Sequence, residues 1–217
     1  MRIQDARVVV LVENLYQELE LWYPVLRLRE AGAKVLIAGP ATDAVYASKI
    51  GYPARAEVNV ADLVAEDIDA LVVPGGFSPE YLRRDRSIVA LVREMDRQGR
   101  IVAAICHAGW LLASAEIVSG RRVTSVAPIR DDLIHAGADY VVEPIVVDGN
   151  LITSPLPDDL PVFVSTIITA LEAAEQLTPD RPPVSAAHSS AAYQRSATLK
   201  NRAAGPGSAN YRAYAVG

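Results

Sequence analysis

Four short apolar runs divide the first half of the chain, and charged residues or glycine bound each of them. The runs are rich in valine and isoleucine and have the length of single strands, which is typical of strands buried on both faces of a sheet. They cover residues 7–13, 34–38, 69–74 and 101–105.

Segments with helical spacing lie between these runs. In residues 18–31 the apolar positions fall on one side of a helix, at Leu19, Trp22, Val25, Leu26 and Leu28. Gly32 then supplies a C-terminal stop. The same reasoning predicts helices over residues 87–98 and 107–115. This alternation predicts an α/β fold with a mainly parallel, doubly wound sheet and helices on both faces.

The second half of the chain predicts three more strands and a long last helix. Asp148-Gly149-Asn150 separates two apolar runs and reads as a hairpin turn, because Asp-Gly is a strong turn signal. The expected strands are residues 122–126, 140–147 and 151–154, and the expected helix is residues 158–177. We therefore expect one α/β domain over residues 1–178.

A tail rich in Pro, Ala and Ser follows, over residues 179–217. From Arg181 onward it has no Asp or Glu and carries a net charge of +5, whereas the first 180 residues carry −10. A basic tail on an acidic body predicts that the tail docks on its own body or on a neighbouring subunit. A loose tail is the alternative. Five spread charges without a motif disfavour nucleic acid as a partner.

The composition is that of a cytoplasmic globular protein without a metal site. Apolar residues make up 51% of the chain, enough for a buried core. The first seven residues include the charged Arg2, Asp5 and Arg7, unlike a signal peptide, and no apolar run reaches the length of a membrane span. One cysteine excludes an internal disulfide and a Cys-rich metal site, and three histidines without repeated spacing disfavour zinc.

The single cysteine is the first candidate for chemistry. A predicted buried strand stops at Cys106 and a helix starts at once, so the thiol sits on a sharp strand-to-helix turn like the nucleophile elbow of other α/β enzymes. The helix N-terminus is expected to lower the pKa of the thiol and to favour the thiolate. From position alone, a packed core cysteine is the alternative.

Two further segments reach the same edge of the predicted sheet. Gly75-Gly76 follows a strand and lets the backbone aim N–H groups at a developing oxyanion. Glu13, Glu18 and Glu20 lie at the end of the first strand and the start of its helix, where a carboxylate can hold the thiol proton or orient an imidazole. No Walker loop and no Gly-x-Gly-x-x-Gly follows the first strand, which disfavours nucleotide and flavin cofactors.

An ordered set of motifs resembles the PfpI branch of the DJ-1/PfpI family, which includes intracellular cysteine peptidases and deglycases. The resemblance spans about residues 7–175. Its motifs are Glu20-Leu-Trp-Tyr-Pro24, Arg27-Leu-Arg-Glu-Ala-Gly32, Pro74-Gly-Gly76, Ala104-Ile-Cys-His107, Asp131-Asp132, Ala136-Gly-Ala138, Val147-Asp-Gly-Asn150 and Pro157-Asp-Asp-Leu160.

The resemblance implies a flavodoxin-like three-layer sandwich that forms dimers, or hexamers built from dimers. It implies Cys106 as the nucleophile with His107 beside it and Glu20 bonded to the thiol. Glu80 matches the acid that orients the histidine in peptidase-like members, where a neighbouring subunit supplies it. The oxyanion-binding backbone matches Gly75 or Gly76 together with the amide of His107.

The chain departs from the family pattern in three places. Family members often carry arginine where Pro155 follows Thr153-Ser154, and they often have Gly-Pro where Ala108-Gly109 precedes Trp110. We expect Trp110 to line the substrate site. The tail also exceeds the usual length.

Three hypotheses for the function remain open. The first is a cysteine-dependent deglycase or glyoxalase-type hydrolase acting on small 2-oxoaldehydes or on their adducts with proteins and peptides. The second is a peptidase or amidase with a Cys106–His107–Glu80 triad closed across a subunit interface. The third is a non-enzymatic redox sensor of the stress response, in which Cys106 is oxidised to a sulfinate stabilised by Glu20.

Overall fold

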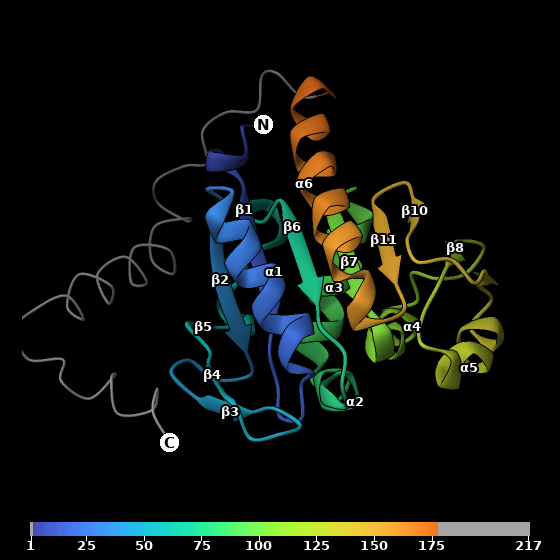
Figure 1. Ribbon diagram of the computed structural model, residues 1–217, viewed down its shortest axis with the longest axis horizontal. Helices are drawn as coiled ribbons and strands as arrows, with labels where there is room; N and C mark the ends of the chain where they lie inside the picture. Colours follow the sequence, from blue (N-terminus) through green and yellow to red (C-terminus); the bar gives the residue numbers. More distant parts are fainter. Residues whose placement is uncertain (1, 178–217) are drawn as a thin grey trace, which may run out of the picture. The chain divides into compact units, whose positions relative to one another are not determined.

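A seven-stranded sheet forms the centre of the computed structural model, which describes residues 2–177 (Figure 1). The strands, in spatial order, are β10 (Val146–Asp148), β11 (Leu151–Ser154), β7 (Ile101–Ile105), β6 (Ala70–Val73), β1 (Arg7–Leu11), β2 (Lys34–Gly39) and β5 (Val58–Asn59). The predicted tail, residues 179–217, lies outside the described residues, so its docking stays a prediction.

Strand pairing in this sheet is parallel except at one edge. β10 pairs with β11 in the antiparallel sense, and every other neighbouring pair is parallel. Every residue of β6 and β7 is buried. Burial on both faces explains why these strands read as uninterrupted apolar runs.

Helices cover both faces of the sheet. α1 (Glu18–Glu30) packs on β1 and β2, α6 (Leu160–Leu177) packs on β7 and β11, and the two helices contact each other. α3 (Arg86–Arg97) packs on β7 from the opposite face (Figure 1). The predicted flavodoxin-like three-layer sandwich is thereby confirmed.

Two small sheets and several short helices surround the central sheet and its long helices. Two small sheets pair β3 (Val45–Ala47) with β4 (Pro53–Arg55) and β8 (Arg122–Val123) with β9 (Asp139–Tyr140). The remaining α-helices are α2 (Ser78–Leu82), α4 (Gly109–Ser114) and α5 (Arg130–His135). The 3-10 helices are η1 (Ile3–Asp5), η2 (Val60–Asp62), η3 (Ala65–Asp67), η4 (Cys106–Ala108), η5 (Ala127–Ile129) and η6 (Pro157–Asp159).

The second half of the sheet differs in detail from the prediction. The strand expected over residues 140–147 is interrupted, because only its two ends pair, in β9 and β10. The strand expected over residues 122–126 is reduced to β8. The predicted hairpin turn is correct: Gly149 has a φ of +58° between the paired residues Asp148 and Leu151.

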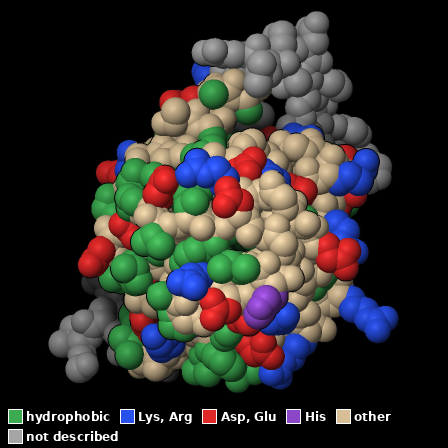
Figure 2. All heavy atoms as spheres, turned by 90° about the vertical axis from the view of Figure 1, so that its right-hand side faces the viewer, with side chains coloured by type: hydrophobic (Ala, Val, Ile, Leu, Met, Phe, Trp, Pro, Cys, Tyr) green, Lys and Arg blue, Asp and Glu red, His purple; other side chains and the backbone are tan. Residues whose placement is uncertain are grey.

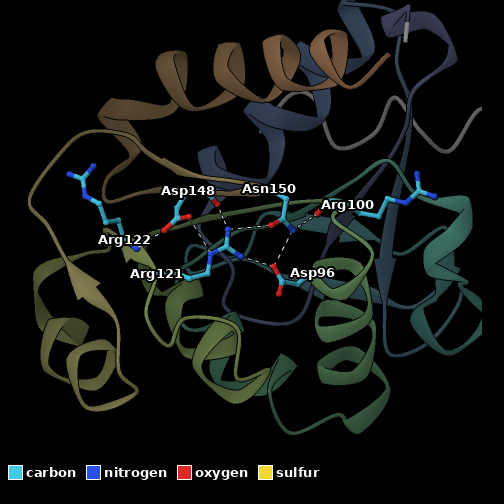
Figure 3. Close-up of polar contacts among 6 residues, drawn as sticks. All are labelled: Asp96, Arg100, Arg121, Arg122, Asp148 and Asn150. Carbon is cyan, nitrogen blue, oxygen red and sulfur yellow. Dashed lines mark hydrogen bonds and ion pairs between the residues drawn. The ribbon is translucent and has the colours of Figure 1, made fainter. Parts of the chain in front are cut away.

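A polar network ties this hairpin to α3 (Figure 3). The Arg121 guanidinium lies 2.7 Å from the Asp96 carboxylate and donates to the Asp148 carbonyl oxygen and to Asn150 Oδ1. The Asn150 amide donates in turn to Asp96 Oδ1 and to the Arg100 carbonyl oxygen. Asn150 and Arg100 directly precede β11 and β7, so the network lies at the edge where these parallel strands begin.

The outer surface near β10 and α5 mixes apolar and charged side chains. Figure 2 shows this face, with acidic and basic groups interspersed among hydrophobic ones. Ile134 on α5, Val147 on β10 and Val142 between β9 and β10 are exposed apolar residues. Within residues 2–177, no helix is long and apolar enough to span a membrane.

Candidate active site

The predicted strand-to-helix turn is present at Cys106. β7 ends at Ile105, and the 3-10 helix η4 begins at the cysteine itself. Cys106 has a φ of +61°. This left-handed backbone conformation costs a non-glycine residue roughly 1–3 kcal/mol and persists only where the surroundings impose it. The turn leaves the cysteine half-buried at the edge where the parallel strands end.

Polar groups from three loops converge on the sulfur. His107 Nδ1 lies 3.3 Å from Cys106 Sγ, and the backbone N–H groups of Gly76 and His107 hydrogen-bond to it. The Glu20 carboxyl interacts with the same thiol. These loops follow β1, β6 and β7, which are neighbours in the sheet, so the topology brings together residues far apart in sequence.

Glu20 is fully buried in the first turn of α1. The Gln17 side chain caps this turn by accepting from the Glu20 backbone N–H at 2.8 Å. Carboxyl oxygen Oε2 accepts from the Gly75 N–H at 2.7 Å, whereas Oε1 is buried with no hydrogen-bond partner of regular geometry among the described residues. The contact with the thiol combines a charge interaction with a side-chain hydrogen bond.

Burial governs the protonation of this pair. It raises the pKa of Glu20 to about 7, although the Gly75 N–H and Cys106 oppose the rise. Burial, followed by the negative charge of Glu20, raises the pKa of Cys106 to about 12. The expectation that the helix entrance lowers the thiol pKa is wrong, because one short 3-10 turn and two amides do not offset desolvation and a neighbouring carboxylate.

His107 stays neutral near pH 7. Burial lowers its pKa first, and the positive charge of Lys49 lowers it further. A neutral imidazole has one nitrogen able to accept a proton, and Nδ1 faces the sulfur. The histidine can therefore take up or return a proton next to the thiol.

The two glycines are required by close packing. A Cβ at Gly75 would lie 2.6 Å from Glu20 Oε2 and 2.7 Å from Cys106 Cβ. Gly76 has a φ of +74°, and a Cβ there would collide with the Leu15 carbonyl oxygen. The pair therefore lets the loop after β6 come within hydrogen-bonding distance of both functional groups.

Lys49 is a charged neighbour of the site that the sequence did not indicate. It lies on the turn between β3 and β4, where its backbone N–H donates to the Tyr16 carbonyl oxygen at 3.0 Å. Its charge lowers the pKa of Glu18, Glu20 and His107. No motif marks this residue, because only the attachment of the hairpin turn to Tyr16 and Glu18 brings it near the site.

The other candidate carboxylates serve local contacts in this chain. Glu18 accepts from the Ile50 N–H at 3.0 Å, and Glu13 accepts from Asn14. Glu80 pairs with Arg84 at 3.0 Å and with Arg83 at 3.6 Å. The assignment of Glu80 to a neighbouring subunit's histidine therefore stays a prediction.

Trp110 lies beside the histidine, with ring centroids 5.1 Å apart. Its indole N–H donates to Asp132 on α5 at 2.8 Å. Asp132 belongs to the Asp131-Asp132 motif, but nothing in the sequence indicates its hydrogen bond to Trp110. Among residues 2–177, no group of three or more His, Cys, Asp or Glu side chains is placed to hold a metal ion.

A half-buried cysteine on a strand-to-helix turn, facing a buried glutamate within a flavodoxin-like sandwich, defines a class of cysteine-centred α/β proteins. The profile of the DJ-1/PfpI family matches residues 6–170. The chain belongs to this family, as its motifs predicted.

Two curated relatives match most of the chain. An uncharacterized protein from Archaeoglobus fulgidus is 48% identical over 166 residues, which are 76% of this chain and 98% of that protein. Deglycase PfpI from Pyrococcus furiosus is 36% identical over 166 residues, covering 76% of this chain and 99% of that protein.

A solved structure has the same fold. DJ-1beta from Drosophila melanogaster superposes with a TM-score of 0.73 at 28% identity. The match covers 81% of this chain and 96% of that one.

Proposed function

We propose that this protein is a cysteine-dependent hydrolase of the deglycase or glyoxalase type. Its substrates are 2-oxoaldehydes or their adducts with amines and thiols. The observation that carries the proposal is the cluster around Cys106 Sγ: His107 Nδ1 at 3.3 Å, two backbone N–H groups and the Glu20 carboxyl. The name of the Pyrococcus furiosus relative, a deglycase, supports the same activity.

The first step is addition of the thiol to the aldehyde carbon. An S–C bond forms, the C=O π electrons move to oxygen, and the thiol proton passes to Glu20. A carboxyl with a pKa of about 7 exchanges protons readily at neutral pH. The N–H groups of Gly76 and His107, which hydrogen-bond to the sulfur, are the donors proposed to stabilise the oxyanion, and one such donor is worth about 3–4 kcal/mol.

In the second step, the former aldehyde carbon is oxidised and the neighbouring ketone carbon is reduced. A proton leaves the former aldehyde carbon and is added to the neighbouring ketone carbon, while the ketone oxygen takes the proton that Glu20 received from the thiol. The product is a thioester of a 2-hydroxy acid. Water then cleaves the S–C bond, releasing the hydroxy acid and restoring the thiol. Glu20 and neutral His107 are the two groups that can shuttle these protons.

When the substrate is an adduct, the group that leaves is the amine or the thiol. The cysteine attacks the carbon that bears it, the C–N or C–S bond breaks, and a protonated neighbour supplies the proton. The released amine or thiol is thereby repaired. No external oxidant or reductant is needed.

The test compares wild type with Cys106→Ser and Glu20→Gln. We expect both variants to lose methylglyoxal consumption and lactate release by at least a hundredfold. Glu30→Gln is the matched control, because this exposed carboxylate lies at the far end of α1 and pairs only with Arg27 at 3.5 Å among the described contacts. Undiminished turnover by Cys106→Ser would refute the proposal.

One observation favours a peptidase or amidase as the second candidate. Within residues 2–177 of one chain, the His107 ring hydrogen-bonds to Cys106, and no carboxylate orients the imidazole. Glu80 on α2 is partly exposed and would supply that acid from another subunit. Glu80→Gln, or dilution to monomers, should then abolish peptide hydrolysis and leave methylglyoxal turnover intact.

A further inference from the structure

An aromatic cluster extends from the histidine across α2 and α4. Trp110 lies 5.1 Å from the His107 ring and 6.1 Å from the Phe77 ring, and Phe77 lies 5.6 Å from Tyr81. The contacts of Phe77 are edge-to-face, with interplanar angles of 89° and 80°. This T-shaped arrangement is favourable and fixes the orientation of each ring. The proposed chemistry does not use any of these three side chains.

The indole is locked in place by α5. Its N–H donates to Asp132 Oδ2 at 2.8 Å, a charge-assisted hydrogen bond that fixes the ring plane. Helix α5 comes this close because the residue before Trp110 is Gly109. A Cβ at Gly109 would meet Ile129 Cδ1 at 3.0 Å and Leu133 Cδ1 at 3.1 Å.

The cluster remains accessible next to the reacting sulfur. Phe77 is 43% exposed and Trp110 is partly buried, so part of each side chain is open to solvent. The His107 imidazole contacts both groups, since its Nδ1 lies 3.3 Å from Cys106 Sγ and its ring centroid lies 5.1 Å from that of Trp110. A substrate attached to the sulfur can therefore place a substituent against the indole.

Flat apolar groups complement such a surface best. An aryl ring gains both apolar burial and an oriented ring–ring contact from a fixed indole, whereas a methyl group gains only a small buried area. Fixing the indole in advance also avoids the cost of ordering it when substrate binds.

We propose that Trp110, held by Asp132, is a specificity-determining residue that favours substrates whose carbonyl group carries a flat aryl substituent. Asp132 is a positioning residue, since it acts through Trp110. The inference rests on the proposed function for its reaction, but selective binding does not require turnover.

The kinetic test compares phenylglyoxal with methylglyoxal, which differ only in the substituent. Wild type should favour phenylglyoxal in kcat/KM, and Trp110→Leu should lower that preference about tenfold, through KM rather than kcat. Asp132→Leu should lower it about threefold, because the indole stays but loses its fixed plane. Asp132→Asn keeps an acceptor oxygen and should retain the wild-type preference.

The second test measures binding without turnover. Mandelate and lactate, the hydroxy acids that the two substrates would yield, are titrated into wild type and Trp110→Leu by calorimetry. Wild type should bind mandelate more tightly than lactate, and Trp110→Leu should lose this selectivity. This result supports the inference even if neither aldehyde is consumed. In that case only the proposed function fails. Equal binding of the two acids by wild type overturns the inference.

A purely structural role for Trp110 is distinguished by folding and assembly. Circular dichroism and light scattering are recorded for each variant. If Trp110→Leu changes thermal stability or oligomeric state while the phenylglyoxal preference persists, the cluster serves packing and the inference is wrong. If the two Asp132 variants lose the preference equally, Asp132 does not act through its acceptor oxygen.

Discussion

The backbone conformation of Cys106 affects both the stability of the fold and the position of the sulfur. Cys106 occupies the left-handed region at φ +61°, which glycine adopts freely and an L side chain does not. The strand–turn geometry therefore exposes the sulfur at the expense of local backbone strain.

Cys106→Gly should therefore be more stable than Cys106→Ala. Both variants remove the sulfur, but only glycine relieves the strained φ, by about 1 kcal/mol. Thermal and urea unfolding of the two variants measure the difference. Equal stabilities would mean that the turn is not strained.

The protonation of Glu20 gives stability a pH dependence with a defined sign. Burial raises the pKa of this carboxyl from 4.5 to about 7, so the folded state favours the protonated form. The stabilisation is complete below pH 4.5, where the carboxyl is protonated in both states. It is lost as the pH rises to 7, because the unfolded chain ionises first.

We expect the stability of wild type to fall, relative to Glu20→Gln, by up to about 3 kcal/mol between pH 4.5 and pH 7.5. Urea unfolding of both proteins across this range measures the difference. Glu30→Gln, at the exposed end of the same helix, should follow wild type. A difference that grows with pH in favour of wild type would contradict the assignment.

At the scale of elements, the β3–β4 hairpin adds a positive charge to a site whose pKa values are governed mainly by burial. Its turn is attached to the loop after β1 through Lys49 N–H to the Tyr16 carbonyl oxygen and through the Tyr16 hydroxyl to the Tyr52 carbonyl oxygen at 2.6 Å. The hairpin thereby holds the charge of Lys49 where it favours the ionised form of Glu20.

Lys49→Met should therefore raise the pKa of both Glu20 and His107. The acid limb of the kcat/KM profile should move to higher pH by a few tenths of a unit, the size expected for an exposed charge, and the shift should shrink in high salt. Lys34→Met removes the same charge at the opposite end of the sheet, where β2 begins, and should leave the profile unchanged.

The elements that the sequence predicts are the ones with long, uniform patterns. β1, β6 and β7 follow from uninterrupted apolar runs, and with them the position of Cys106. Helical spacing predicts the bounds of α1, but its predicted apolar side is partly wrong, because Leu19 and Leu26 are exposed. β3 and β4 escape prediction because each has three residues, of which only the central one is buried. α2 and α5 are too short to show a helical period.

The chemistry of the site is less predictable than its residues. The motifs identify Glu20, Cys106 and His107, but not the raised thiol pKa, because desolvation depends on how completely the chain encloses each group. Lys49 and Asp132 come near the site only through tertiary packing. Their contribution could not be read from local sequence.

At the scale of the whole molecule, the polar network around Arg121 connects the edge hairpin to the core (Figure 3). The Arg121 side chain is 19% exposed and its partner Asp96 is 23% exposed. The adjacent Arg122 is 51% exposed and pairs with a Glu143 side chain that is 49% exposed.

Arg121→Met should lower the free energy of unfolding by about 2–3 kcal/mol, because it leaves partly buried acceptors without a donor. Arg122→Met should cost less than about 1 kcal/mol. Since the network lies where β7 and β11 begin, kcat/KM of the folded Arg121→Met protein should stay at the wild-type value. Equal losses in the two variants would contradict this account.

The separate origin of the converging loops has a consequence for laboratory evolution. Glu20, Gly76 and Cys106 follow three different strands of a rigid scaffold. Under the proposed function, a library that randomises Phe77 and Trp110 should therefore change which molecules are accepted while Glu20, the loop glycines and Cys106 keep their identities.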